Sequence, residues 1–203
     1  MTSFITGIVA GLAIAVPPGA IATLILQTGL HRGFRSAFAA GLGCATVDFL
    51  YASIAVSLGA ALVPVLGAAE PALRVAAGMA LIAIGILGML GVRRRSGTAV
   101  PPTTTAELLR TYLRFVGLTL VNPATLAYFL AVALGLGREV LTDAPAFVAG
   151  VVLATGTWQS LLALVSGSLH GRIGPSARGT IAIAANGVVV GLGARILAQV
   201  LAG

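Results

Sequence analysis

The sequence predicts an all-α integral membrane protein with six transmembrane helices, arranged as two inverted three-helix repeats with broken first and fourth helices. Hydrophobic residues make up 58% of the chain and charged residues only 8%, whereas a soluble domain carries roughly 25% charged residues. The apolar runs also reach the length of about 20 residues that a membrane-spanning helix needs. The predicted spans are residues 3–28, 37–62, 72–92, 112–136, 145–169 and 179–201.

Proline interrupts the first and fourth spans at corresponding places. The first contains VPPGAIATLIL and the fourth VNPATLAYFLA, so that Pro18 aligns with Pro123 at an offset of 105 residues. Proline removes a helical hydrogen bond, and in a bilayer the freed backbone groups must line a cavity or pack in protein. A matched pair of breaks points to the central binding site of a transporter. The predicted site residues at the breaks are Pro17, Pro18, Gly19, Asn122 and Pro123.

The second span carries an acidic residue near mid-membrane. Asp48 lies eleven residues into this span, about 16 Å along a helix, where a carboxylate costs roughly 2.5–3.5 kcal/mol to insert. It must face protein or water, where it can bind a proton or the ammonium group of a cargo molecule. A structural hydrogen bond to a broken helix end is the alternative. Tyr51, three residues later, shares its helix face.

Polar residues also occur deep in the fifth and sixth spans. Thr155 and Gln159 are four residues apart and therefore share a helix face, and Asn186 lies midway along the sixth span. We include all three in the predicted substrate site, together with the acid and the breaks. Hydrogen bonding between helices is the alternative role for each of them.

A polar, proline-containing stretch, GTAVPPTTT at residues 97–105, separates the two halves of the chain. This composition is typical of a linker. It predicts a first repeat at 1–96, a cytoplasmic linker at 97–111 and a second repeat at 112–203. Because each repeat has three spans, the second repeat enters the membrane from the opposite side, which makes the repeats inverted.

The distribution of charge predicts the topology. Nine of the twelve basic residues lie in or beside the first, third and fifth loops: Arg32, Arg35, Arg93, Arg94, Arg95, Arg110, Arg114, Arg172 and Arg178. By the positive-inside rule these loops are cytoplasmic, and both termini lie outside. The first span lacks a basic n-region and a small-residue cleavage site, so we expect it to be retained. The net charge of +7 therefore indicates orientation at a lipid surface and no nucleic-acid partner.

Missing motifs exclude several functional classes. The chain has no GxxxxGK[ST] phosphate loop, no HExxH and no CxxC, and Cys44 is its only cysteine. The sequence therefore predicts no enzyme, no cofactor and no metal site. Gly7 and Gly11 form a GxxxG pattern, which is typical of close helix packing, with a dimer face as one option.

Four segments carry a resemblance to a known family: AVPPGA in the first span, LQTGLHRGFRSAFAAGLGCATVDFLY after it, FVGLTLVNPATLAYFLAV in the fourth span, and GVVVGLGARIL near the end. They resemble the lysine exporter (LysE/RhtB) superfamily of bacterial amino-acid exporters. Residues at the family's motif positions are Pro18, Gly19, Asp48, Asn122 and Pro123. Ala20 and Ala124 depart from the family pattern, which commonly has proline and lysine there. The resemblance implies export of amino acids across the inner membrane, driven by the proton-motive force, and allows a homodimer.

The sequence thus predicts an inner-membrane secondary transporter that exports amino acids or related small metabolites in exchange for protons, with Asp48 as the proton-coupling residue. An exporter of a metal or other inorganic ion with the same fold is the alternative. One deep acid without a deep cluster of His or Met residues is a poor ligand set for a divalent ion. A membrane-embedded enzyme would need a nucleophile–base pair or a second cysteine, and a structural subunit would not need two matched breaks.

Overall fold

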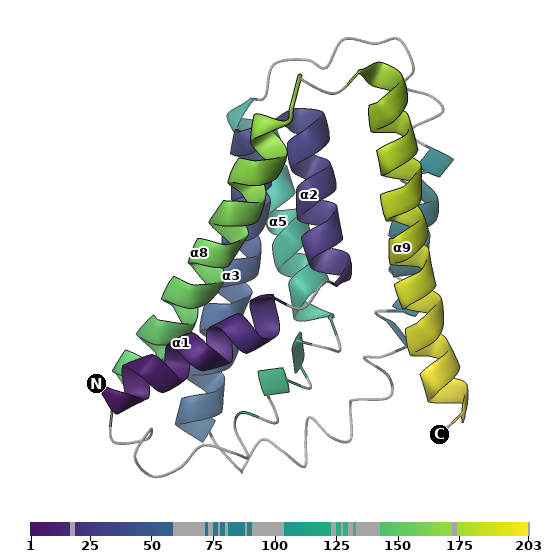
Figure 1. Cartoon of the computed structure of the whole chain (residues 1–203). Helices are drawn as coiled ribbons and strands as arrows, with labels where there is room; N and C mark the ends of the chain where they lie inside the picture. The colour runs from purple at the N-terminus through teal and green to yellow at the C-terminus, as the bar shows by residue number, and fades with distance from the viewer. Residues whose placement is uncertain are drawn as a thin grey trace.

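The computed structural model describes residues 1–16, 19–58, 104–122, 143–171 and 174–202, with shorter pieces at 72, 75–76, 78–79, 81–87, 89–90, 125–126, 128–129 and 132. All regular elements in these parts are α-helices, which form a bundle with both termini at its lower end in the view of Figure 1. The predicted helical class is confirmed for these residues. Pro17, Pro18, Pro123 and residues 97–103 of the predicted linker lie outside them.

The labelled helices agree closely with the predicted spans. They are α1 (Thr2–Ala15), α2 (Ala20–Arg32), α3 (Phe34–Leu58), α5 (Thr105–Leu120), α8 (Ala144–Ser168) and α9 (Pro175–Ala202). Helices α3 and α8 are each long and apolar enough to cross a membrane alone, and α1 and α2 are so as a pair. The α1–α2 pair, α3, α8 and α9 therefore begin and end within about four residues of the first, second, fifth and sixth predicted spans, the usual uncertainty of such boundaries.

The first span is broken where the sequence predicts. Helices α1 and α2 are separated by residues 16–19 and differ in direction by 75°. Gly19, the residue before α2, has an extended backbone with φ −134° and ψ −179°, which a continuing helix does not allow. As a result α1 lies obliquely across the lower half of the bundle, while α2 stands upright (Figure 1).

The fourth span begins earlier than predicted and ends at the predicted break. Helix α5 starts at Thr105 instead of residue 112, because Thr104 and Glu107 form a capping box. The Thr104 hydroxyl accepts from the Glu107 amide at 3.3 Å, and the Glu107 carboxylate accepts from the Thr104 amide at 3.2 Å. These bonds satisfy two backbone donors that a helix start leaves free. The helix ends at Leu120, just before Asn122, and residues 125–126 and 128–129 are again helical.

Helix α8 is the element against which α1, α2 and α3 all pack. Its contact with α1 is so close that a Cβ atom on Gly7 would overlap the Phe147 carbonyl, and one on Gly150 would overlap the Phe4 carbonyl. A Cβ atom on Gly11 would lie 2.8 Å from that of Ala154. The GxxxG pattern therefore packs α1 within the chain, so these glycines do not form a free dimer face.

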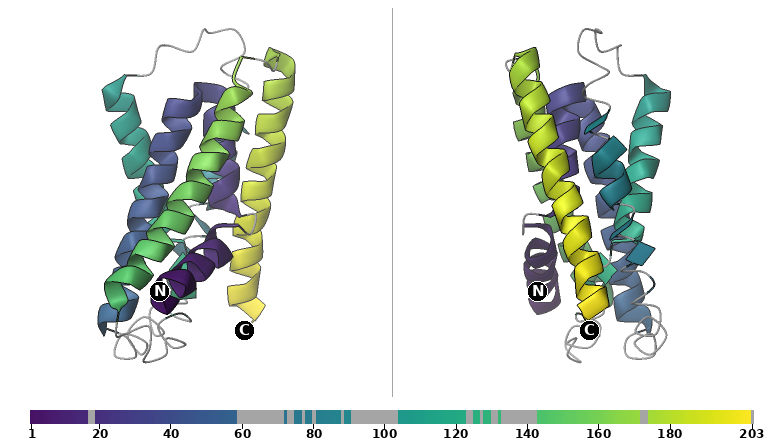
Figure 2. Two further views of the ribbon diagram at one scale, coloured as in Figure 1. Left: turned by 60° about the vertical axis from the view of Figure 1, so that its left-hand side comes forward. Right: turned by 90° about the vertical axis from the view of Figure 1, so that its right-hand side faces the viewer.

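Helix α9 packs on the far side of α2 and against the third predicted span (Figure 2). A Cβ atom on Gly193 would lie 2.8 Å from the Gly78 carbonyl, and one on Gly85 would lie 2.9 Å from the Asn186 carbonyl. Leu81 and Val189 join the main core cluster through this contact. Small residues that allow such close backbone approach are typical of helix packing in lipid.

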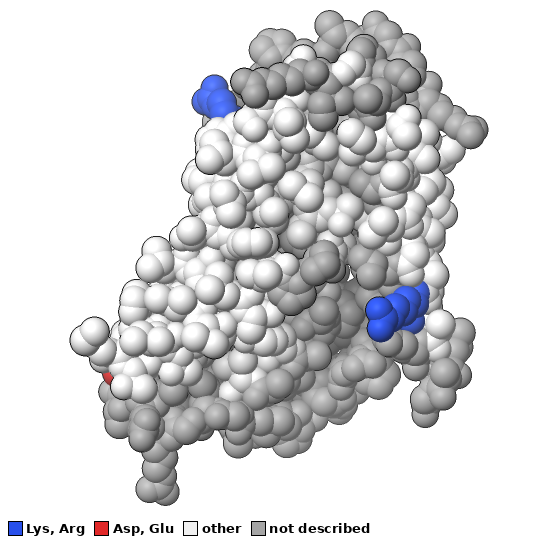
Figure 3. Space-filling model, viewed as in Figure 1, with Lys and Arg blue, Asp and Glu red and all other residues white. Residues whose placement is uncertain are grey.

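The two ends of the bundle differ in charge. Arg32 ends α2, Arg35 lies in the first turn of α3, and Arg110 lies near the start of α5. Gly43 of α3 packs on Tyr112 of α5, so these two helices start from the same end of the bundle. We call this the arginine end and the opposite one the terminal end. Between them the face in Figure 3 is almost uncharged, apart from basic atoms over α9, as a lipid-facing surface requires.

The α1–α8 contact predicts a selective effect of glycine substitution. Gly7→Ala should lower the thermal stability of the purified protein, because overpacking typically costs 1–3 kcal/mol and the obstacle here is a backbone carbonyl. Gly156→Ala on α8 is the matched control, since nothing lies within 4 Å of the added atom and alanine favours a helix over glycine. Thermal unfolding in detergent measures both. Equal melting temperatures for the two variants would contradict the packing described.

Candidate functional site

Asp48 is buried in the middle of α3, where it faces α8. Only 5% of its surface is exposed, and the nearby Thr155 of α8 is fully enclosed. The Thr155 hydroxyl is within interaction range of the Asp48 carboxyl group, yet its position does not meet the geometry of a full hydrogen bond. The structure therefore brings together two predicted site residues that are more than 100 positions apart in the sequence.

The same face of α3 reaches the end of α5. Cys44, Asp48 and Tyr51 are spaced at i, i+4 and i+7, which places them on one side of a helix. Thr119 donates a hydrogen bond to the Cys44 sulfur at 3.4 Å, and the Tyr51 hydroxyl donates to the Leu120 carbonyl at 2.7 Å. Leu120 is the last residue of α5, so its carbonyl is one of those that a helix end leaves without a partner. Tyr51 thus connects the acid-bearing face to the second break.

Two further polar atoms on α8 are buried without a hydrogen-bond partner. They are Oε1 of Gln159 and Nε1 of Trp158, in addition to Oγ1 of Thr155. Gln159 packs against α3. A Cβ atom added to Gly41 of α3 would lie 2.9 Å from the Cβ atom of Gln159. A buried polar group without a partner costs roughly 1–3 kcal/mol. Such a group needs an explanation, and a ligand or water that meets it is one.

The first break lies beside the same core. Ala20 and Ile21, the first residues of α2, pack on the cluster that includes Cys44. No side chain caps this helix start. The Gly19 carbonyl accepts two hydrogen bonds from Thr23, one from its backbone amide at 3.1 Å and one from its hydroxyl at 2.9 Å. The amides at the start of a helix carry a partial positive charge that favours an anion. The first break therefore supplies donors, whereas the acceptors lie around Asp48.

Asn186 has a different environment from the other predicted site residues. Its side-chain amide donates to the Ala182 carbonyl of α9 at 2.7 Å, and Gln27 of α2 donates to the same carbonyl at 3.3 Å. The first bond stays within α9, and the second joins α2 to α9. Among the described residues no hydrogen bond links Asn186 to Asp48. Asn186 stays a predicted substrate contact, and its observed hydrogen bond lies within α9 and not between helices.

Sequence reasoning gave too little weight to Thr119 and Tyr128. The Tyr128 hydroxyl donates to the Ala10 carbonyl of α1 at 2.6 Å, a contact between residues 118 positions apart. No local pattern predicts that pairing. For Thr119, its place one residue before the end of α5 is the signal that could have drawn attention to it.

The chain matches the LysE type translocator family over residues 12–200. The chain belongs to this family. The match covers both predicted breaks, the Asp48 helix, α8 and nearly all of α9. This translocator is thus a multi-pass membrane protein that moves small molecules, and its family is one of transporters and not of enzymes. No curated protein and no solved structure matches the chain.

The Thr155 hydroxyl predicts a larger effect on transport than on stability. Thr155→Val removes a buried oxygen that lies near Asp48 without a full hydrogen bond, so it should change the free energy of unfolding by no more than about 1 kcal/mol while lowering transport. Thr157→Val is the matched control, because Thr157 is exposed on the same helix. Thermal unfolding and an efflux assay of the same preparations measure the two effects. A larger loss of stability in Thr155→Val would show that the hydroxyl is a structural hydrogen-bonding group.

Proposed function

We propose that this translocator is an inner-membrane secondary transporter that exports amino acids or related small metabolites in exchange for protons. The observation that carries the proposal is the buried Asp48 carboxyl group, which faces the unpartnered Thr155 hydroxyl and lies on the same helix face as the Tyr51 contact to the second break. An acid of this kind inside a membrane is typical of ion and substrate pathways.

The two breaks offer complementary charges to a zwitterion. The uncapped start of α2 supplies backbone donors suited to a carboxylate. Asp48, together with Oγ1 of Thr155 and Oε1 of Gln159, supplies acceptors suited to an ammonium group. An α-amino acid carries both groups on one carbon atom. The arrangement therefore supports an amino acid better than a cargo with a single charge.

Competition for one carboxyl group can couple cargo to protons. An ionised Asp48 attracts the ammonium group of the cargo, and a protonated Asp48 does not. If the site faces the cytoplasm, the ionised form loads cargo. If it faces outside, where protons are more abundant, protonation of Asp48 releases the cargo, and the neutral acid returns with its proton. One cargo molecule then leaves for each proton that enters.

The direction of export follows from the distribution of charge. The arginine end, with Arg32, Arg35 and Arg110, corresponds to the predicted cytoplasmic loops. Both termini lie at the other end (Figure 1), as an even number of spans requires. We place the arginine end in the cytoplasm and both termini outside. The equal lengths of α3 and α8, each 25 residues, fit their equivalence in two inverted repeats.

The role of Asp48 predicts a loss of gradient-driven efflux on neutralisation. Asp48→Asn should reduce efflux on the order of tenfold or more, since removing a hydrogen-bonded charge costs roughly 1.5–3 kcal/mol. Asp48→Glu retains an acid and should keep part of the activity. Efflux from cells with matched amounts of inserted protein measures the effect. Efflux by Asp48→Asn at the normal rate would remove Asp48 from the mechanism.

The cargo class is tested by efflux of preloaded radiolabelled amino acids, with and without a protonophore. We expect protein-dependent efflux that stops when the proton gradient collapses. Competition by divalent metal ions or other inorganic ions, without efflux of any basic, neutral or hydroxyl amino acid, would favour the ion exporter instead. Amino-acid efflux that continues in the presence of the protonophore would support the amino-acid cargo but contradict proton coupling.

A further inference from the structure

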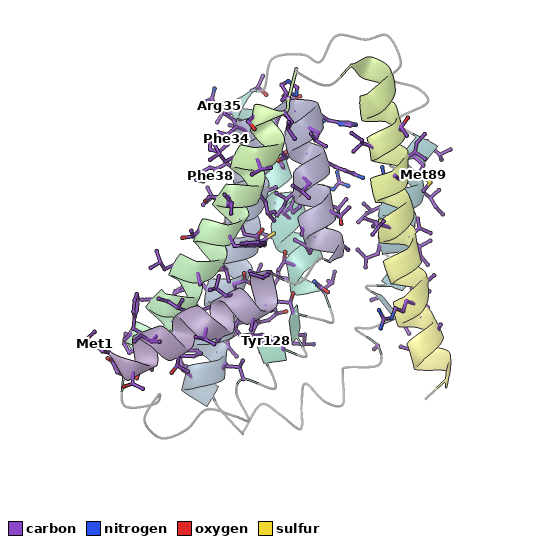
Figure 4. All side chains as sticks on the ribbon, in the orientation of Figure 1. Met1, Phe34, Arg35, Phe38, Met89 and Tyr128 are labelled. Atoms are coloured by element: carbon purple, nitrogen blue, oxygen red, sulfur yellow. The ribbon has the colours of Figure 1, made fainter. Side chains whose placement is uncertain are left out.

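Four aromatic side chains, two of them buried and two partly buried, form a layer on the terminal side of Asp48. This aromatic layer consists of Tyr51 on α3, Tyr128 and Phe129 after the second break, and Phe147 at the start of α8. The Tyr51 and Phe129 rings are 5.8 Å apart, and the Tyr128 and Phe129 rings meet edge to face at 5.6 Å. Figure 4 shows Tyr128 next to the inner end of α1. The layer thus joins α1, α3, α8 and the segment after the second break.

The buried face of α8 changes character at the level of Asp48. Toward the arginine end it carries buried polar residues, namely Thr155, Gln159 and Ser166. Toward the terminal end the buried residues are Phe147, Gly150, Val151 and Ala154, which pack with the aromatic layer or with α1. Asp48 therefore lies where these buried polar side chains, which share their side of the bundle with the main apolar core, meet the apolar residues next to the layer.

Both tyrosines in the layer donate to the backbone of a broken span. Tyr128 donates to the Ala10 carbonyl of α1 at 2.6 Å, and Tyr51 donates to the Leu120 carbonyl at the end of α5 at 2.7 Å. The first bond ties the broken fourth span to the broken first span. The second ties the end of the fourth span to the acid-bearing helix. Movement of the segment after the second break away from α1 must break the first bond, and movement of the end of α5 away from α3 must break the second.

We propose that the aromatic layer is the gate that closes the Asp48 site from the terminal end, and that Tyr51 and Tyr128 hold it shut. Charged or zwitterionic solutes do not cross a packed apolar layer, so the site opens on that side only when the rings separate. The inference takes the direction of traffic from the proposed function. The existence of the gate needs only the contacts above.

The single cysteine provides a built-in probe. Cys44 is the only cysteine in the chain, it is 1% exposed, and it lies one turn before Asp48 on the same face of α3. If the layer is the gate, a charged, membrane-impermeant thiol reagent added at the terminal end reaches Cys44 only when the layer opens. The rate of Cys44 labelling in proteoliposomes therefore measures opening of the gate, without any knowledge of the cargo.

Tyr128→Phe and Tyr51→Phe each remove one hydroxyl and keep the ring. We expect each to raise the rate of labelling from the terminal side roughly three- to tenfold, as the loss of one hydrogen bond predicts. The chain has three tyrosines, and Tyr112→Phe is the matched control. Its hydroxyl donates to Thr46 at 3.1 Å and likewise joins α5 to α3, but it lies outside the layer. That variant should label at the original rate.

Labelling from both sides separates a gate from general loosening. Reagent is added on the side where protease cuts an N-terminal tag, and in a second set on the opposite side. A gate raises only the first rate. An equal rise on both sides, an equal rise in Tyr112→Phe, or no rise in either layer variant would overturn the proposal. If the native protein exports amino acids but Cys44 labelling is unchanged in both layer variants, the gate proposal alone is wrong. If labelling rises on one side only and no amino acid is exported, only the proposed cargo is wrong.

Discussion

A carboxyl group buried halfway across a bilayer has to be met by polar groups from the protein, and the packing around Asp48 reflects that constraint. Insertion of such a group costs roughly 2.5–3.5 kcal/mol. Helix α8 supplies Thr155 opposite it, with Gln159 one turn further on. Helix α5 ends beside the same face of α3, where its last carbonyl is taken by Tyr51. The end of α5 and the buried acid are therefore linked through one helix face. Tyr51, which binds the free carbonyl of Leu120, lies one turn after Asp48 on that face.

Close backbone contact provides the rigidity that this arrangement needs. Helix α1 has only 14 residues, and it is held by glycines that allow backbone to meet backbone across α8. Helix α9 meets the third predicted span in the same way. Contacts of this kind tolerate sliding poorly, because an interior packed to native density has few gaps to absorb a shift. Motion during transport is therefore concentrated where rings and single hydrogen bonds, and not backbones, make the contact.

Much of the fold could be predicted because hydrophobic length and proline position are local properties. The bounds of α3 and α8, the bend at residues 16–19 and the end of α5 before Asn122 all follow from them. The early start of α5 was missed although its signal is also local, a threonine followed three residues later by glutamate. The contacts of Asp48 with Thr155 and of Tyr128 with Ala10 could not be predicted, because each depends on how distant helices cross. The sequence identifies Asn186 as a deep polar residue but does not predict that its side chain donates to the backbone carbonyl of Ala182.

The lengths of α3 and α8 tie this protein to its lipid environment. A helix of 25 residues is about 37 Å long, whereas the hydrocarbon core of a bilayer is about 30 Å thick. Such helices match the membrane by tilting, and the tilt depends on the chain length of the surrounding lipid. Because α1 is fixed to α8 and points across the bundle, a change in that tilt reaches the first break directly. Hydrophobic mismatch thus acts mechanically on the proposed transport site.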